Sequence, residues 1–161
     1  MNRYSAAFVA VSLFVFASCG DQSAAPDPGN AQPVQSIDPA EKMAALPAPF
    51  ATADYAKGRS IFRRCASCHL VSKEAGHLVG PNLHRVFDRK VGTAEGFQYS
   101  SALSGADFQW TPERLDAWLV DPEGYLPGNR MIFVGLSNPE ERVAVTAYLM
   151  AEAGWPPLTD Q

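Results

Sequence analysis

The sequence lacks the features that mark several large functional classes. It has no basic stripe and no run of like charge, and its net charge is −4, which argues against a nucleic-acid-binding protein. Glycine-rich phosphate loops, Gly-x-Ser-x-Gly, His-Glu-x-x-His and internal repeats are all absent. Cysteine and histidine are scarce, with three residues of each among 161. What these few residues do is therefore the main question that the sequence raises.

Residues 1–19 have the layout of a bacterial export signal. Arg3 precedes an apolar run from Ala6 to Ala17, and small residues follow it. Only when extended from Tyr4 to Gly20 does the segment barely reach the ~17 residues that a membrane-spanning helix needs, so an uncleaved protein anchor is the second interpretation. The segment ends in FASC, which resembles the bacterial lipobox although that motif usually begins with Leu. It predicts a lipidated Cys19, and ordinary cleavage would instead release a soluble periplasmic protein.

Residues 20–50 are predicted to be a linker, and residues 51–161 to be the folded domain. Proline, alanine and small polar residues dominate the linker, which has too few apolar side chains to build a core. A flexible coil of this length reaches roughly 30 Å on average, and a stiff polyproline form reaches up to ~95 Å. The linker would let the domain move about its anchor.

The folded domain is predicted to be mainly α-helical, with long loops. An alanine-rich run indicates one helix over Thr52–Arg64. A second helix begins after Thr111 and stops before Pro122, and a third begins after Asn138 and ends near Gly154. The stretches between them are rich in Gly and Pro and show no alternating strand pattern. A domain with so little regular structure usually packs around something else.

The stretch RRCASCHLV brings two cysteines and a histidine together, and three interpretations compete for it. A redox dithiol at Cys65 and Cys68 would belong near a βαβ pattern, which is missing. Half of a zinc site would need His77 and His84, whose spacing does not suit a zinc finger. The third interpretation is Cys-x-x-Cys-His, the c-type haem attachment sequence, with His69 as the histidine.

Haem attachment explains why these residue types occur at this spacing. Cys65 and Cys68 lie one helical turn apart, so both thiols can form thioethers to one planar ring, and His69 can rise to the iron as the proximal ligand. The sixth position decides between an electron carrier and a protein with an open iron. The candidate ligands for it are His77, His84, Met131 and Met150.

Several short motifs follow one another along the chain between Gly58 and Leu149. Gly58 and Phe62 precede CASCH, and GPNLHRVFDRKVG, GFQYS, Trp110, YLPGNRMIF and AYL follow. From about Gly58 to Leu149 the chain resembles class I cytochromes c of the mitochondrial and alphaproteobacterial cytochrome c2 type. The resemblance implies a mainly α fold, with helices and long loops wrapped around one covalently bound haem c. It also implies that Met131 is the distal ligand, with Met150 as core filler and His77 and His84 as structural residues.

The same resemblance implies roles for other residues. The carbonyl of Pro81 should accept a hydrogen bond from the free ring nitrogen of His69. Gly58 and Phe62 should pack against Tyr148 and Leu149. The residues expected at the haem propionates, as hydrogen-bond donors or as a compensating charge, are Arg89, Tyr99, Ser100, Trp110 and Asn129.

The chain also departs from the family pattern. Asn129-Arg130 stands where Thr-Lys is common, and Glu123-Gly124 stands where relatives often carry paired lysines. Residues 51–161 contain 11 Lys and Arg against 13 Asp and Glu, so the basic docking face of the mitochondrial protein is weakened. Arg63, Arg64 and Arg130 either keep a small basic ring near the haem edge or are simply solvated.

The function predicted from the sequence is one-electron transfer by a monomer with His–Met ligated haem c, not catalysis. The resemblance implies a quinol–cytochrome c oxidoreductase as the donor and a terminal oxidase as the acceptor. The expected location is the periplasmic face of the bacterial inner membrane, through the N-terminal anchor. Two alternatives remain: a dedicated haem c subunit of a dehydrogenase, and a ligand-binding or peroxidatic haem protein.

Overall fold

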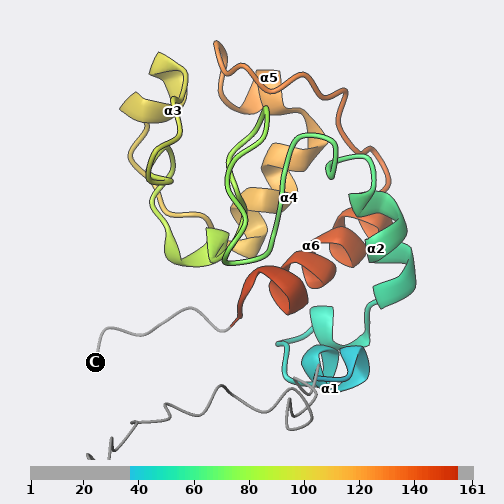
Figure 1. Ribbon diagram of the computed structural model, residues 1–161. Helices are drawn as coiled ribbons and strands as arrows, with labels where there is room; N and C mark the ends of the chain where they lie inside the picture. The colour runs from blue at the N-terminus through green and yellow to red at the C-terminus, as the bar shows by residue number, and fades with distance from the viewer. Residues whose placement is uncertain (1–36, 156–161) are drawn as a thin grey trace, which may run out of the picture. The chain divides into compact units, whose positions relative to one another are not determined.

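The computed structural model describes residues 37–155, which form a mainly helical unit (Figure 1). Within these residues the only β-bridge is an isolated one between Lys90 and Gln109, so this part of the chain has no sheet, as predicted. None of its helices is long and apolar enough to cross a bilayer. The elements in chain order are α1 (Pro39–Ala44), η2 (Phe50–Thr52), α2 (Tyr55–Phe62), η3 (Val86–Asp88), α3 (Ser101–Gly105), α4 (Pro112–Val120), α5 (Pro122–Tyr125) and α6 (Pro139–Ala153).

The helices begin at side chains that cap free backbone N–H groups. Thr111 accepts a hydrogen bond from the N–H of Arg114 at the start of α4, and Asn138 accepts one from Glu140 at the start of α6. Asp54 caps α2, so this helix starts later than the predicted Thr52, which belongs to η2. The predicted starts of α4 and α6 are confirmed because their caps are local features of the sequence.

Helices α2 and α6 cross in close contact (Figure 1). A Cβ atom at Gly58 would lie 2.2 Å from the carbonyl oxygen of Ala144 and 2.9 Å from the Cβ of Tyr148. The rings of Phe62 and Tyr148 follow along the same crossing, with centroids 5.2 Å apart. The glycine therefore lets the two backbones touch, as the family resemblance implied.

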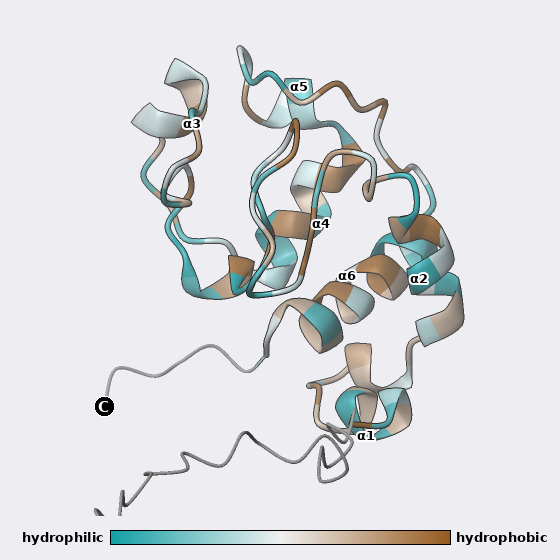
Figure 2. Cartoon of the chain, in the orientation of Figure 1, coloured by the Kyte–Doolittle hydropathy of each residue, from teal (hydrophilic) through white to brown (hydrophobic). Residues whose placement is uncertain are grey.

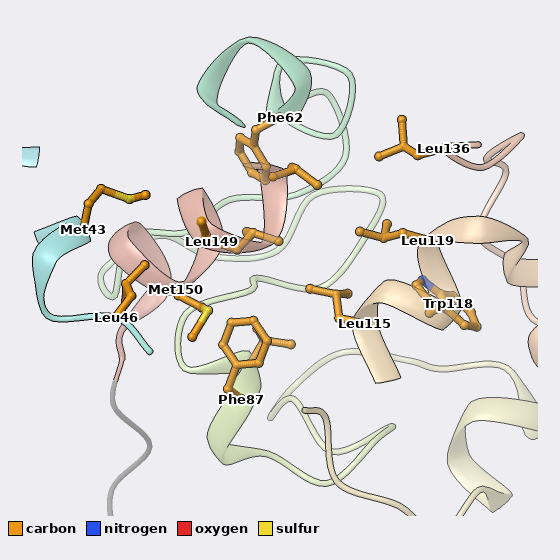
Figure 3. Packing of buried hydrophobic residues seen from close by; sticks show 13 residues of the cluster. Met43, Leu46, Phe62, Phe87, Leu115, Trp118, Leu119, Leu136, Leu149 and Met150 are labelled. Atoms are coloured by element: carbon orange, nitrogen blue, oxygen red, sulfur yellow. The ribbon is translucent and has the colours of Figure 1, made fainter. Parts of the chain in front are cut away.

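The hydrophobic core lies between α2, α4, α6 and the chain around η3 (Figure 3). Figure 2 shows hydrophobic segments alternating with hydrophilic ones along α4, which has one apolar face. Helix α6 is buried on more than one side, because the four successive residues from Ala144 to Ala147 are all buried. Met150 is fully buried in this core, near Phe87. Leu115, Trp118 and Leu119 of α4 pack in the same cluster, as expected from their helical spacing.

The N-terminal end of the described unit differs from the sequence prediction. Residues 39–46 were placed in the linker, but α1 is helical and the side chains of Met43 and Leu46 are buried beside α6 (Figure 3). Lys42 Nζ forms an ion pair with Glu152 Oε1 at 3.0 Å, and the hydroxyl of Tyr55 donates to the same oxygen at 3.0 Å. The folded unit therefore begins before residue 51. The predicted signal, Cys19 and residues 20–36 of the predicted linker lie outside the described residues.

Candidate functional site

A cavity of about 570 Å³ opens between α2, α4, α6 and the loops that join them. This volume lies within the ~300–1,000 Å³ that is typical of ligand and cofactor sites. Apolar side chains from all three helices and from the loops form most of its wall, among them Leu83, Leu119 and Leu149. Cys65, Cys68, His69 and Met131 line it too, although they come from segments more than 60 residues apart in the sequence.

The two cysteines reach the cavity because the backbone keeps turning after α2. The N–H groups of Cys68 and His69 both donate to the carbonyl of Cys65 at 2.9 Å. Both thiols are free, and burial raises the pKa of the Cys65 thiol, although Arg64 beside it lowers that pKa. A buried thiol with a raised pKa is a poor redox nucleophile. Among residues 37–155, no group of three His, Cys, Asp or Glu could hold a zinc ion.

His69 is held by a hydrogen bond and by a close backbone contact. Its Nδ1 lies 2.7 Å from the carbonyl oxygen of Pro81, which can only accept, so Nδ1 carries the proton and Nε2 keeps its lone pair. Burial lowers the pKa of His69, against the opposing effect of the Pro81 hydrogen bond, so the imidazole is neutral at neutral pH. A Cβ on Gly80 would lie 2.3 Å from His69 Cε1, so only glycine fits beside the ring. This arrangement suits a metal ligand.

Met131 is the only one of the four candidate sixth ligands that lines the cavity. Met150 is fully buried in the core instead. His77 is engaged elsewhere: its Nδ1 accepts from the N–H of Asn82 at 2.9 Å, so its Nε2 must donate to the carbonyl of Glu95 at 2.8 Å. The placement agrees with the assignment of Met131 as the distal ligand.

Several polar side chains that line the cavity suit the negatively charged groups of a cofactor. Arg89, Tyr99, Ser100 and Trp110, all expected at the propionates, line the cavity together. Burial lowers the pKa of the Arg89 guanidinium and raises the pKa of the Tyr99 phenol. Arg89 donates to the carbonyl of Asn82 at 2.7 Å, but it takes part in none of the ion pairs between described residues. A half-buried cation without a carboxylate partner is stabilised by an anion brought by the cofactor.

Asn129 does not have the role that was expected of it. It is absent from the cavity wall, and its Nδ2 donates to the carbonyls of Pro122 at 2.9 Å and Leu126 at 3.1 Å. Its Oδ1 accepts from the N–H of Met131 at 2.8 Å. The side chain is therefore engaged within its own loop and is not available to a propionate.

The rim of the cavity carries two of the three arginines considered for a basic ring, and an exposed apolar patch that the sequence did not reveal. Arg64 and Arg130 line the cavity, and Arg64 lies over the ring of Phe133, 5.4 Å from its centroid. Ile132 and Val79 also line the cavity, although their side chains are largely in solvent, with relative exposures of 101% and 83%. Figure 2 shows that the loop after α5 is largely hydrophobic. No periodicity marks this exposed apolar rim, which depends on how two distant loops meet. The close contact between Gly80 and His69 was missed for the same reason.

Two thiols, a neutral imidazole, a thioether, an apolar wall and an unpaired cation together fit covalently bound haem c. These features define an electron-transfer protein of the c-type haem class. The chain belongs to the cytochrome c family, whose model matches residues 55–152.

Known relatives support this assignment. A cytochrome c of Chlamydomonas reinhardtii is 47% identical over 97 residues, which cover 60% of this chain and 87% of that protein. A cytochrome c of Nigella damascena is 42% identical over 97 residues, with the same coverage of each chain. A cytochrome c of Ulva intestinalis is 43% identical, again over 97 residues, 60% of this chain and 87% of the relative. The element α1 lies outside the matched family region.

Proposed function

We propose that this cytochrome c carries one electron at a time through a His69–Met131 ligated haem, between a quinol–cytochrome c oxidoreductase and a terminal oxidase. The observation that carries the proposal is the position of Met131, the only candidate sixth ligand that lines the cavity. When bound, haem c supplies a reversible one-electron couple. Met131 and His69 would hold its iron through a thioether and an imidazole, and this ligand set would favour electron transfer over binding of small ligands.

The chain's own residues set the conditions for this role. Pro81 holds the ring of His69 in the tautomer that leaves Nε2 free to bind iron. Apolar side chains exclude water from the cavity, which stabilises the less charged ferrous state relative to the ferric one. Arg89 and the hydroxyls of Tyr99 and Ser100 offset the charge of the propionates.

The exposed rim suits brief contact with redox partners. Ile132 and Val79 present apolar surface beside the cavity, and Arg64 and Arg130 add positive charge. Weak electron-transfer complexes bury less than ~1,200 Å², so a small patch of this kind is sufficient.

A visible spectrum of the oxidised protein tests the ligation. A weak far-red band from the sulfur–iron bond is expected at neutral pH, and Met131→His should abolish it while keeping a low-spin haem with a lower reduction potential. Met150→Leu is the matched control, because it changes a fully buried methionine outside the cavity and conserves volume. Loss of the band in Met150→Leu but not in Met131→His would refute the ligand assignment. A wild-type protein that lacks the band would favour a ligand-binding or peroxidatic haem protein.

We also propose that the chain is anchored on the periplasmic face of the bacterial inner membrane, through lipid on Cys19 or through an uncleaved signal. The support is the basic start at Arg3, the apolar run over residues 6–17 and the lipobox-like FASC. The mass of the mature N-terminus decides between the forms. Cys19 with lipid supports the lipoprotein, an intact Met1 supports the protein anchor, and a free N-terminus at residue 20 or beyond would make the protein soluble.

The effect of anchoring on the rate needs a truncation that leaves the fold intact. Deleting residues 1–50 would also remove Met43 and Leu46 from the core, so the cut belongs after residue 36. A flexible tether made of residues 20–36 would reach roughly 20–25 Å, which raises the effective concentration toward the millimolar range. Oxidation by a membrane-bound oxidase should therefore slow in the variant that starts at residue 37, at equal total concentration. Equal rates would contradict the tether's role.

A further inference from the structure

The loop that carries Met131 is fastened by a set of hydrogen bonds that includes an acidic side chain. Residues 126–131 are called the ligand loop. Glu123, which precedes this loop, accepts a hydrogen bond through Oε1 from the N–H of Gly128 at 3.2 Å. Glu123 Oε2 accepts from Asn129 Nδ2 at 3.1 Å. The carboxylate in the first turn of α5 thus binds both the backbone and a side chain of the loop that follows this helix.

Asn129 extends this set to the methionine. Its amide nitrogen binds Glu123 and the carbonyls of Pro122 and Leu126, which leaves its amide oxygen to accept the N–H of Met131 at 2.8 Å. Only one orientation of the Asn129 amide gives every partner a hydrogen bond, because the three partners of its nitrogen are all acceptors and the partner of its oxygen is a donor. The set therefore fixes the backbone at Met131 relative to α5.

We propose that Glu123 and Asn129 are positioning residues that hold the ligand loop closed and so keep Met131 on the haem iron. This inference rests on the proposed ligation by Met131. Hydrogen bonds to a charged acceptor are stronger than neutral ones, and Glu123 supplies two of them. Glu123 is exposed and Asn129 is half-buried, so the larger share of the effect falls on Asn129.

Two conservative substitutions separate the contributions. Asn129→Asp keeps an acceptor for the Met131 N–H but removes the donor, and it sets a carboxylate against two carbonyls and Glu123. Glu123→Gln keeps one acceptor and replaces the other with an NH₂ group. Glu74→Gln is the matched control, because it makes the same change of charge at an exposed glutamate away from the ligand loop.

The readout is the concentration of added imidazole that replaces half of the far-red sulfur–iron band. Imidazole reaches the iron only when the loop opens, so its apparent affinity rises by the factor by which opening becomes easier. The half-saturating concentration should fall about threefold in Glu123→Gln and about tenfold in Asn129→Asp, and stay unchanged in Glu74→Gln. Cyanide should show the same factors, because loop opening precedes the binding of either ligand.

A double variant provides a test that general destabilisation does not pass. In Glu123→Gln combined with Asn129→Asp, the new amide can donate to the new carboxylate. The half-saturating imidazole concentration should therefore lie between the value of Asn129→Asp and that of the wild type. The proposal would be overturned if both single variants bound imidazole and cyanide as the wild type does. It would also be overturned if the double variant showed the product of the two single falls in half-saturating concentration. Either result would leave the ligation by Met131 intact. A wild-type protein without the far-red band would overturn both.

Discussion

Replacing Gly58 with alanine tests how strongly the α2–α6 crossing limits the sequence. Two effects oppose each other in Gly58→Ala. Alanine stabilises a helix by ~1 kcal/mol relative to glycine, which would favour the variant. Against this, the added Cβ would lie 2.2 Å from the carbonyl oxygen of Ala144 and 2.8 Å from its carbonyl carbon, both of which are backbone atoms of α6.

The clash should outweigh the helix propensity. A backbone carbonyl inside a helix cannot rotate away as a side chain can, so α2 and α6 must move apart, and Phe62 then loses packing against Tyr148. Overpacking of this kind costs ~1–3 kcal/mol before the lost contacts are counted, so we expect a net loss of ~2 kcal/mol in the free energy of unfolding.

Thermal unfolding of the haem-loaded protein, followed by far-ultraviolet circular dichroism, measures this loss. For a domain of this size ~2 kcal/mol corresponds to a fall in Tm of roughly 6–12 °C. Gly76→Ala is the control, since nothing lies within 4 Å of the added methyl and its φ is not in the left-handed region. It should leave the Tm nearly unchanged. A Gly58→Ala protein as stable as the wild type would show that the helices separate at no cost and would refute the reasoning.

Three further predictions follow from single contacts. Gly80→Ala would place a methyl 2.3 Å from the ring of His69, so the imidazole must tilt and the high-spin fraction in the visible spectrum should rise. Met43→Ala should lower the free energy of unfolding by ~2–4 kcal/mol in urea titrations, whereas Ile37→Ala, at a 57% exposed position, should change it little. The pKa of Tyr55 is raised to about 12, chiefly by burial and by its bond to a carboxylate. Its stabilising effect is therefore present below pH ~10 and lost as the pH rises toward 12, and Tyr55→Phe should flatten the stability profile there.

The parts of the fold that the sequence predicted are those fixed by local chemistry. Thr111 and Asn138 cap the helices that follow them, and each lies directly before a proline suited to the first turn. Cys65, Cys68 and His69 are adjacent in the sequence, so their convergence needs only a helical turn. The contact between Gly80 and His69 needed knowledge of how a loop returns to the cavity, which no local pattern supplies.

The element α1 shows a different limit. Averaged over residues 20–50, the composition is that of a linker. Met43 and Leu46 lie about one helical turn apart and form a short apolar face, which is buried against the core. The sequence pattern alone does not indicate that α6 covers this face. A six-residue helix is marginal by itself, and tertiary contacts such as the Lys42–Glu152 ion pair stabilise it. Its position outside the family match means that resemblance gave no help either.

Asn129 and Glu123, which both depart from the pattern that the family resemblance implies, are hydrogen-bonded to each other in this chain. The sequence established only that Asn129 can donate a hydrogen bond, and the structure gives that bond to carbonyls and a carboxylate within seven residues of it. The resemblance implies a lysine at the position of Glu123, so the residue expected to weaken a basic docking face is also the one that accepts two hydrogen bonds from the ligand loop. A lysine there could not accept the N–H of Gly128 or the amide of Asn129. Under the proposed function, contact with redox partners would then rest on the apolar rim at Ile132 and on Arg64 and Arg130.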